Sequence, residues 1–174
     1  MKSLHRWDSQ LSARLTLPPT DPKWPLAAKA AHLGDGTLVF LGLGLAYLAG
    51  WLFDQPFLRL AMMVLLATLL ITATVIIFIK YTLRRERPRD PTGFVTIAYD
   101  KYSFPSGHSA RMGCLAMTVL FFYPLIGLIL VLLALLVALA RVVVGVHYLG
   151  DVVVGLAIGA IIAASFVGWL DLVG

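Results

Sequence analysis

The chain has 174 residues, of which 60% are hydrophobic and 13% are charged, and its net charge is +5. A water-soluble domain of this length buries too small a fraction of its surface to hide so many apolar side chains. The composition therefore excludes a soluble globular protein and predicts one membrane-embedded domain, residues 1–174, with lipid around much of it.

The first 36 residues are predicted to lie at the membrane surface. Apolar side chains near the start recur at helical spacing: Leu4, Trp7, Leu11 and Leu15. We expect an amphipathic helix between lipid and water, and a partly disordered tail is the alternative. Four prolines between residues 18 and 25 then predict a break in regular structure.

The apolar segments predict an all-α bundle of five transmembrane helices: 37–53, 57–79, 106–123, 125–145 and 149–170. The count depends on the 29 uncharged residues from Met112 to Ala140, which are many for one helix and few for two. Pro124 lies near the middle of this run, and a helix normally ends before such a proline. We therefore expect two helices there.

This count places two polar segments on the same side of the membrane. Lys80–His108 joins the second and third helices, and Arg141–Asp151 joins the fourth and fifth. A single helix over residues 112–140 would instead put them on opposite sides. Each segment contains cations and a histidine, so the five-helix count predicts one shared site.

The first candidate group is the basic segment that begins at Lys80. Lys80 and Arg87 are seven residues apart, which returns them to one face of a helix, where two cations can hold one anion. The alternative is that these residues only anchor a helix end in the interface.

The second group is the segment from Pro105 to His108. Proline suits the first position of a helix, and Gly107 allows close approach of a ligand to the backbone. The free amides of a first helical turn favour a bound phosphate, Ser106 adds a hydroxyl, and His108 adds a group that titrates near neutral pH. A capped helix with an unrelated histidine is the alternative.

The third group is Arg141, His147 and Asp151. His147 and Asp151 are four residues apart, so on a helix the carboxylate can orient the imidazole and aim its other nitrogen outward as a nucleophile. A bend near Gly145 would bring Arg141 to the same place. Such residues at membrane depth are costly unless they are paired and used.

A metal site is the rival interpretation of two histidines and an aspartate. Cations gather in the same segments, however, and would repel a divalent ion while attracting an oxyanion: Lys80, Arg87, Arg141 and also Arg111. We therefore expect a phosphate site and no metal.

The ordered set K-x6-RP, PSGH and R-x5-H-x3-D, from Lys80 to Asp151, resembles the type 2 phosphatidic acid phosphatase (PAP2) superfamily, which also includes vanadium haloperoxidases. The stretch Leu33–Gly36 resembles a segment common before the first span of small bacterial members. Two departures stand beside the third motif, where Ala140 replaces the usual serine and Leu149 replaces a frequent proline.

The resemblance implies roles for these residues. His147 would attack phosphorus and form a phosphohistidine, Asp151 would orient it, and His108 would protonate the leaving oxygen and later activate water. The remaining motif residues would bind the phosphoryl oxygens: Lys80, Arg87, Ser106, Gly107 and Arg141. No cofactor is implied.

A site at the membrane face predicts a lipid phosphate substrate, namely phosphatidic acid, phosphatidylglycerol phosphate, a polyprenyl diphosphate or a phosphorylated glycolipid. We expect membrane lipids and no nucleic acid as partners. The alternatives are a non-catalytic lipid-phosphate carrier and a halide-oxidising enzyme. Because Arg59 is the only one of the 14 Lys and Arg on the far side, the site is predicted at the cytoplasmic face of a bacterial inner membrane.

Overall fold

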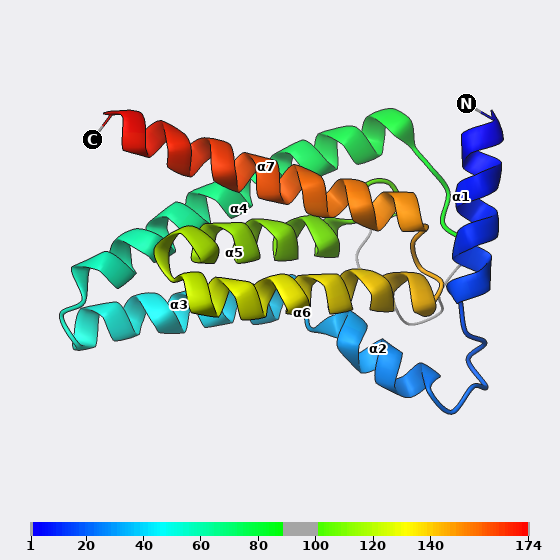
Figure 1. Ribbon diagram of the computed structural model, residues 1–174, viewed down its shortest axis with the longest axis horizontal. Coiled ribbons are helices and arrows are strands. Elements are labelled where there is room, and N and C mark those ends of the chain that lie inside the picture. Colours follow the sequence, from blue (N-terminus) through cyan, green and yellow to red (C-terminus); the bar gives the residue numbers. More distant parts are fainter. Residues whose placement is uncertain (1, 89–100, 174) are drawn as a thin grey trace.

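A computed structural model describes residues 2–88 and 101–173 of the chain. Within these ranges the secondary structure is helical, without strands, and Figure 1 shows the arrangement. The described helices are α1 (Lys2–Leu15), α2 (Trp24–His32), α3 (Gly36–Leu52), α4 (Pro56–Leu83), α5 (Gly107–Phe122), α6 (Pro124–Val143) and α7 (Leu149–Val173). The all-α prediction is confirmed.

Helix α5 occupies the middle of the bundle and packs against α4, α6 and α7. Helix α1 lies across the end of the bundle where α4 ends and α7 begins, as Figure 1 shows. At the same end, α2 packs against α6 through small side chains, Ala28 and Ala31 against Ala140 and Val144. The described parts of the two polar segments meet at this end, where Arg85 and Arg87 contact the turn before α7.

Three of the described helices are long and apolar enough to cross a membrane: α4, α6 and α7 over Leu149–Leu170. Helices α2 and α3 pass the same test together as a pair bent by 47°, which raises the number to four. The described helices therefore support an integral membrane protein. The count of five spans, which also needs the 16 residues of α5, stays a prediction.

The predicted break in regular structure is confirmed over residues 16–23, between α1 and α2. The last of the four prolines, Pro25, instead stands in the first turn of α2, where a backbone N–H needs no helical partner. Helix α4 continues to Leu83 instead of ending at residue 79. In α1, Trp7 and Leu11 are exposed, as an interfacial helix requires, and the side chain of Leu4 lies outside the described part.

Glycines allow α5 and α7 to approach closely. A Cβ atom at Gly155 would come within 2.5 Å of the Ser106 carbonyl oxygen, and one at Gly113 would come equally close to that of Leu156. At Gly159 it would overlap the Ala110 carbonyl oxygen. Small residues at such a contact let two membrane helices pack backbone to backbone. This contact fixes the start of α5 beside the start of α7.

The close contact leads to a stability prediction. Gly159→Ala is expected to lower stability by about 1–3 kcal/mol, because the new methyl group meets backbone atoms that cannot move independently. The control is Gly168→Ala on the same helix, where a Cβ meets nothing within 4 Å and alanine favours the helix. Thermal unfolding in detergent measures both variants, and an equal Tm for the two would contradict this account of the contact.

Candidate active site

The turn between α6 and α7 carries His147. Helix α6 ends at Val143, and Gly145 has a φ of 82°, a left-handed conformation that suits glycine. This is the bend that was predicted near Gly145. His147 lies in the turn before α7, so the predicted stacking of His147 and Asp151 on one helix is wrong. The two side chains are still adjacent, with 3.6 Å between His147 Nδ1 and Asp151 Oδ2, and both are fully buried.

The basic segment reaches the same place by a route that the helical spacing did not predict. Helix α4 ends at Leu83 and Arg84 adopts a left-handed φ of 50°, so Lys80 and Arg87 do not share a helical face. Instead, Lys80 Nζ donates to the Tyr102 carbonyl oxygen at 2.6 Å, and Arg87 Nη2 lies 3.5 Å from the same oxygen. The backbone at Tyr102 holds the two cations near each other.

Arg87 also connects the basic segment to the histidine. Its Nη1 donates to the Val146 carbonyl oxygen at 3.0 Å and lies 3.4 Å from His147 Nε2. His147 therefore turns Nδ1 toward a carboxylate and Nε2 toward a cation. A nucleophile oriented in this way faces the place where an anion would bind.

The environment of His147 favours the neutral ring. Burial lowers the pKa of His147 well below its ordinary value, and the positive charges of Arg141, Arg87 and Lys80 lower it further. Arg141 is buried in the last turn of α6. A neutral imidazole keeps the lone pair that a nucleophile needs.

The segment Pro105–His108 is joined to the turn by its backbone. Ser106 is the N-cap of α5, its N–H donates to the Asp151 carbonyl oxygen at 2.9 Å, and its Oγ accepts from the Ser109 amide. The helix begins at Gly107, one residue after the predicted start at Ser106, so Pro105 precedes the N-cap and does not occupy the first helical position. Gly107 and His108 supply the first amides of α5, where an anion is favoured.

His108 and Arg111 both point to the bend between α2 and α3. His108 Nε2 lies 2.6 Å from Asp35 Oδ1. Arg111 donates from Nε and Nη2 to the Gly34 carbonyl oxygen, at 3.2 and 3.0 Å. The structure thus brings together five of the predicted residues: Lys80, Arg87, Arg141, His147 and Asp151. Arg111 instead donates to the backbone at Gly34.

Two residues that the motifs did not single out support the turn that carries His147. Arg85 donates to Asp151 Oδ1 at 2.7 Å and to Asp8 Oδ2 at 2.6 Å. Asp8, on α1, also accepts from the Gly150 amide. Their partners are at least 66 residues away in sequence, so local spacing contains no signal for them.

The donor set suits an anion. Within residues 2–88 and 101–173, no three His, Cys, Asp or Glu side chains gather as a metal-binding group. Apart from the Asp151 carboxylate, the charged side chains around His147 are cations: Lys80, Arg87 and Arg141. Such a group can bind the oxygens of a phosphoryl group and stabilise the charge of its transfer.

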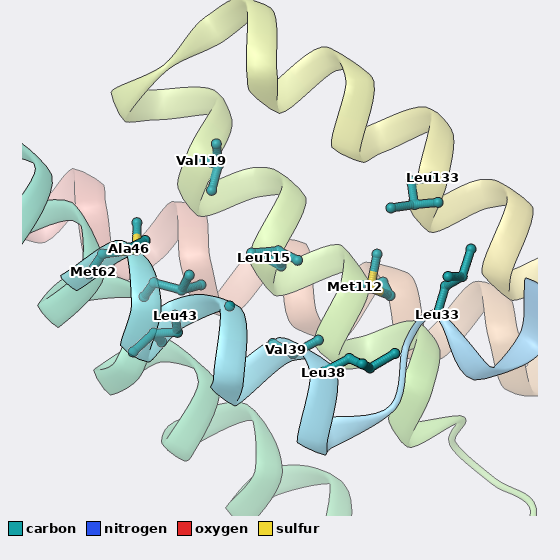
Figure 2. A pocket seen from close by; sticks show the side chains of 12 residues that line it. Leu33, Leu38, Val39, Leu43, Ala46, Met62, Met112, Leu115, Val119 and Leu133 are labelled. Carbon is teal, nitrogen blue, oxygen red and sulfur yellow. The ribbon is translucent and has the colours of Figure 1, made fainter. Parts of the chain in front are cut away.

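An apolar groove of about 270 Å³ runs along α3 and α5 from the bend at Leu33. Figure 2 shows Leu38 and Val39 of α3 facing Met112 and Leu115 of α5 across it. The end of the groove at Leu33 adjoins the site, because a Cβ at Gly34 would lie 3.2 Å from Met112 Cγ and 3.5 Å from His108 Cβ.

A family model described as the PAP2 superfamily matches residues 60–173, which include every motif residue of the site. The chain belongs to the PAP2 superfamily. The match covers well over half of the chain, so the resemblance drawn from the three motifs is confirmed at the level of the family.

Curated relatives of this PAP2 chain match it over shorter stretches. It is 38% identical over 90 residues to a decaprenylphosphoryl-5-phosphoribose phosphatase of Mycobacterium tuberculosis, which covers 51% of this chain and 49% of that one. It is 40% identical over 58 residues to a lipid A 1-phosphatase of Rhizobium johnstonii, which covers 33% of this chain and 24% of the relative. The chain thus spans half or less of the length of these relatives.

Two crystal structures share the fold of this PAP2 chain. One is a transmembrane PAP2-type phosphatidylglycerolphosphate phosphatase from Bacillus subtilis, with a TM-score of 0.82 and 22% identity over 100% of this chain and 89% of that one. The other is Aquifex aeolicus LpxE, with a TM-score of 0.69 and 23% identity over 91% and 93% of the two chains.

Proposed function

We propose that this PAP2 protein is a metal-independent phosphatase that hydrolyses a phosphomonoester or diphosphate of a membrane lipid through a phosphohistidine on His147. The observation that carries the proposal is a buried histidine whose two ring nitrogens face opposite charges, Asp151 at 3.6 Å and Arg87 at 3.4 Å. This arrangement supports a nucleophile aimed at a bound phosphate.

The reaction would proceed in two steps. His147 Nε2 forms a bond to phosphorus as the bond to the lipid oxygen breaks, and His108 gives that oxygen a proton. Water, deprotonated by His108, then displaces the histidine and releases inorganic phosphate. The binding groups would be the cations and the first turn of α5: Lys80, Arg87, Ser106, Gly107 and Arg141.

The groove beside His108 supports a lipid substrate. Its lining is apolar and its end at Leu33 adjoins the site, so a lipid whose hydrocarbon chain lies in the groove would present its phosphate to the cations. The named relatives are phosphatases of lipid A and of a decaprenylphosphoryl sugar phosphate. Phosphatidic acid, phosphatidylglycerol phosphate, polyprenyl diphosphates and phosphorylated glycolipids are the candidate substrates.

A phosphate-release assay across these four lipid classes in detergent tests the proposal. We expect release of inorganic phosphate from at least one class, unchanged by a chelator and inhibited by vanadate. Binding of the lipids without any release would favour a lipid-phosphate carrier on the same scaffold instead.

We also propose that the site faces the cytoplasm from a bacterial inner membrane. The support is the distribution of charge, because Arg59 lies in the first turn of α4, and Figure 1 shows this end of α4 at the opposite end of the bundle from α1. Lys101→Cys adds an exposed thiol beside the site, while the native Cys114 is buried. An impermeant maleimide should label this variant only after the cells are permeabilised, and labelling of intact spheroplasts would place the site outside.

A further inference from the structure

The carboxylate of Asp35 is directed at histidines. Asp35 occupies the N-cap of α3, where an aspartate usually accepts a hydrogen bond from a backbone amide, yet its side chain makes no such cap. Its Oδ1 lies 2.6 Å from His108 Nε2, and its Oδ2 lies 2.9 Å from His32 Nδ1. Both oxygens are used for imidazole.

The backbone around Asp35 is held in place against α5 and α6. The Gly34 carbonyl oxygen accepts two hydrogen bonds from Arg111, one turn beyond His108 on α5. A side chain at position 34 has no room, since a Cβ would come within 2.9 Å of Val137 Cγ1. The carboxylate therefore meets His108 at a defined position.

The Asp35 carboxylate also adds a negative charge beside His108, in a site whose other charged groups are mostly positive. The titratable and charged groups that share the site with His108 come from α2, α4, α5, α6, the loops and α7: His32, Lys80, Arg111, Arg141, Arg87, His147 and Asp151. Most of these groups are cations, and nearby cations disfavour a positive charge on the His108 ring. Asp151 contacts Arg85 at 2.7 Å, whereas Asp35 contacts His108 directly within the part of the chain that the structure describes.

We infer that Asp35 is a positioning residue that orients His108 and keeps its ring protonated for transfer to the leaving oxygen. The inference rests on the proposed function. Because His108 Nε2 is hydrogen-bonded to Asp35, the proton that His108 transfers comes from its Nδ1. As the His147–phosphorus bond forms and the phosphorus–oxygen bond breaks, this proton moves to the lipid oxygen, and the bond to Asp35 holds the ring throughout.

The test compares two esters in single-turnover phosphorylation of the enzyme. One carries an alkyl leaving group, which needs a proton, and the other carries a nitrophenyl group, which leaves without one. Asp35→Asn is expected to slow phosphorylation of the enzyme by the alkyl ester about 10- to 100-fold. The rate of phosphorylation by the nitrophenyl ester should stay within about threefold of that of the unmodified protein. The alkaline limb of the alkyl-ester profile should also move to lower pH.

The control is Asp54→Asn, at the far turn between α3 and α4, where the carboxylate is 94% exposed. This control should change the rate of phosphorylation by neither ester. A full burst of nitrophenolate from Asp35→Asn shows that the variant is folded. Equal slowing of both esters with an unmoved pH profile would overturn the role of Asp35, whereas absence of phosphorylation in the unmodified protein would refute the proposed function itself.

Discussion

His147→Gln is expected to lower the rate of phosphate release by at least about 10⁴-fold, because glutamine can hydrogen-bond but cannot form a phosphohistidine. The loss should appear in kcat. Lys80, Arg87 and Arg141 remain in the variant, so its affinity for the lipid phosphate should change little. Phosphate release from the best substrate class and equilibrium binding of the same lipid measure the two quantities.

Thermal unfolding serves as the control for His147→Gln. The His147 ring is buried, and its contacts with charged side chains among the described residues are no shorter than 3.4 Å, so the variant should fold with a Tm close to that of the unmodified protein. A folded variant that still turns over at the original rate would contradict the assignment of the nucleophile.

Arg85→Met is expected to destabilise the protein by about 3–5 kcal/mol, since it leaves the buried Asp151 carboxylate without its cation. The same change releases Asp8 of α1, which also holds the Gly150 amide. Phosphate release should fall about 100-fold even where the protein is folded, because the turn that carries His147 loses its support. Thermal unfolding and initial rates measure these effects.

Arg84→Met is the matched control, because Arg84 is exposed and its side chain donates only to the nearby Tyr81 carbonyl oxygen among the bonds described for it. A second variant separates charge from shape. Adding Asp151→Asn to Arg85→Met removes the unpaired buried charge, so it should recover stability but not activity. If Arg85→Met melts like Arg84→Met, the ion pair with Asp151 contributes nothing to stability.

The sequence predicted the site at the level of motifs and the fold at the level of helices. Hydropathy located the apolar segments, and Pro124 divided the long run correctly into α5 and α6. The need to bring Arg141 to His147 predicted the bend at Gly145, where the backbone has a positive φ. These features are encoded locally, in composition and spacing.

The errors and omissions share a physical cause. Helical spacing explained Lys80 and Arg87 by a shared face, but the chain leaves the helix at Arg84 and the two meet through Tyr102. The contacts of Asp8 and Asp35 were missed, although Asp35 lies in the noted stretch Leu33–Gly36, because each partner is more than 70 positions away. Contacts of this kind depend on tertiary packing, which no local pattern contains.

The covalent intermediate provides the most direct test of the account. A substrate labelled with ³²P is mixed with the protein, quenched in alkali within one turnover, and the peptides are mapped. We predict acid-labile, alkali-stable label on His147, and no label in His147→Gln. Turnover of the labelled lipid with label on His108, or with no labelled histidine, would contradict the central claim.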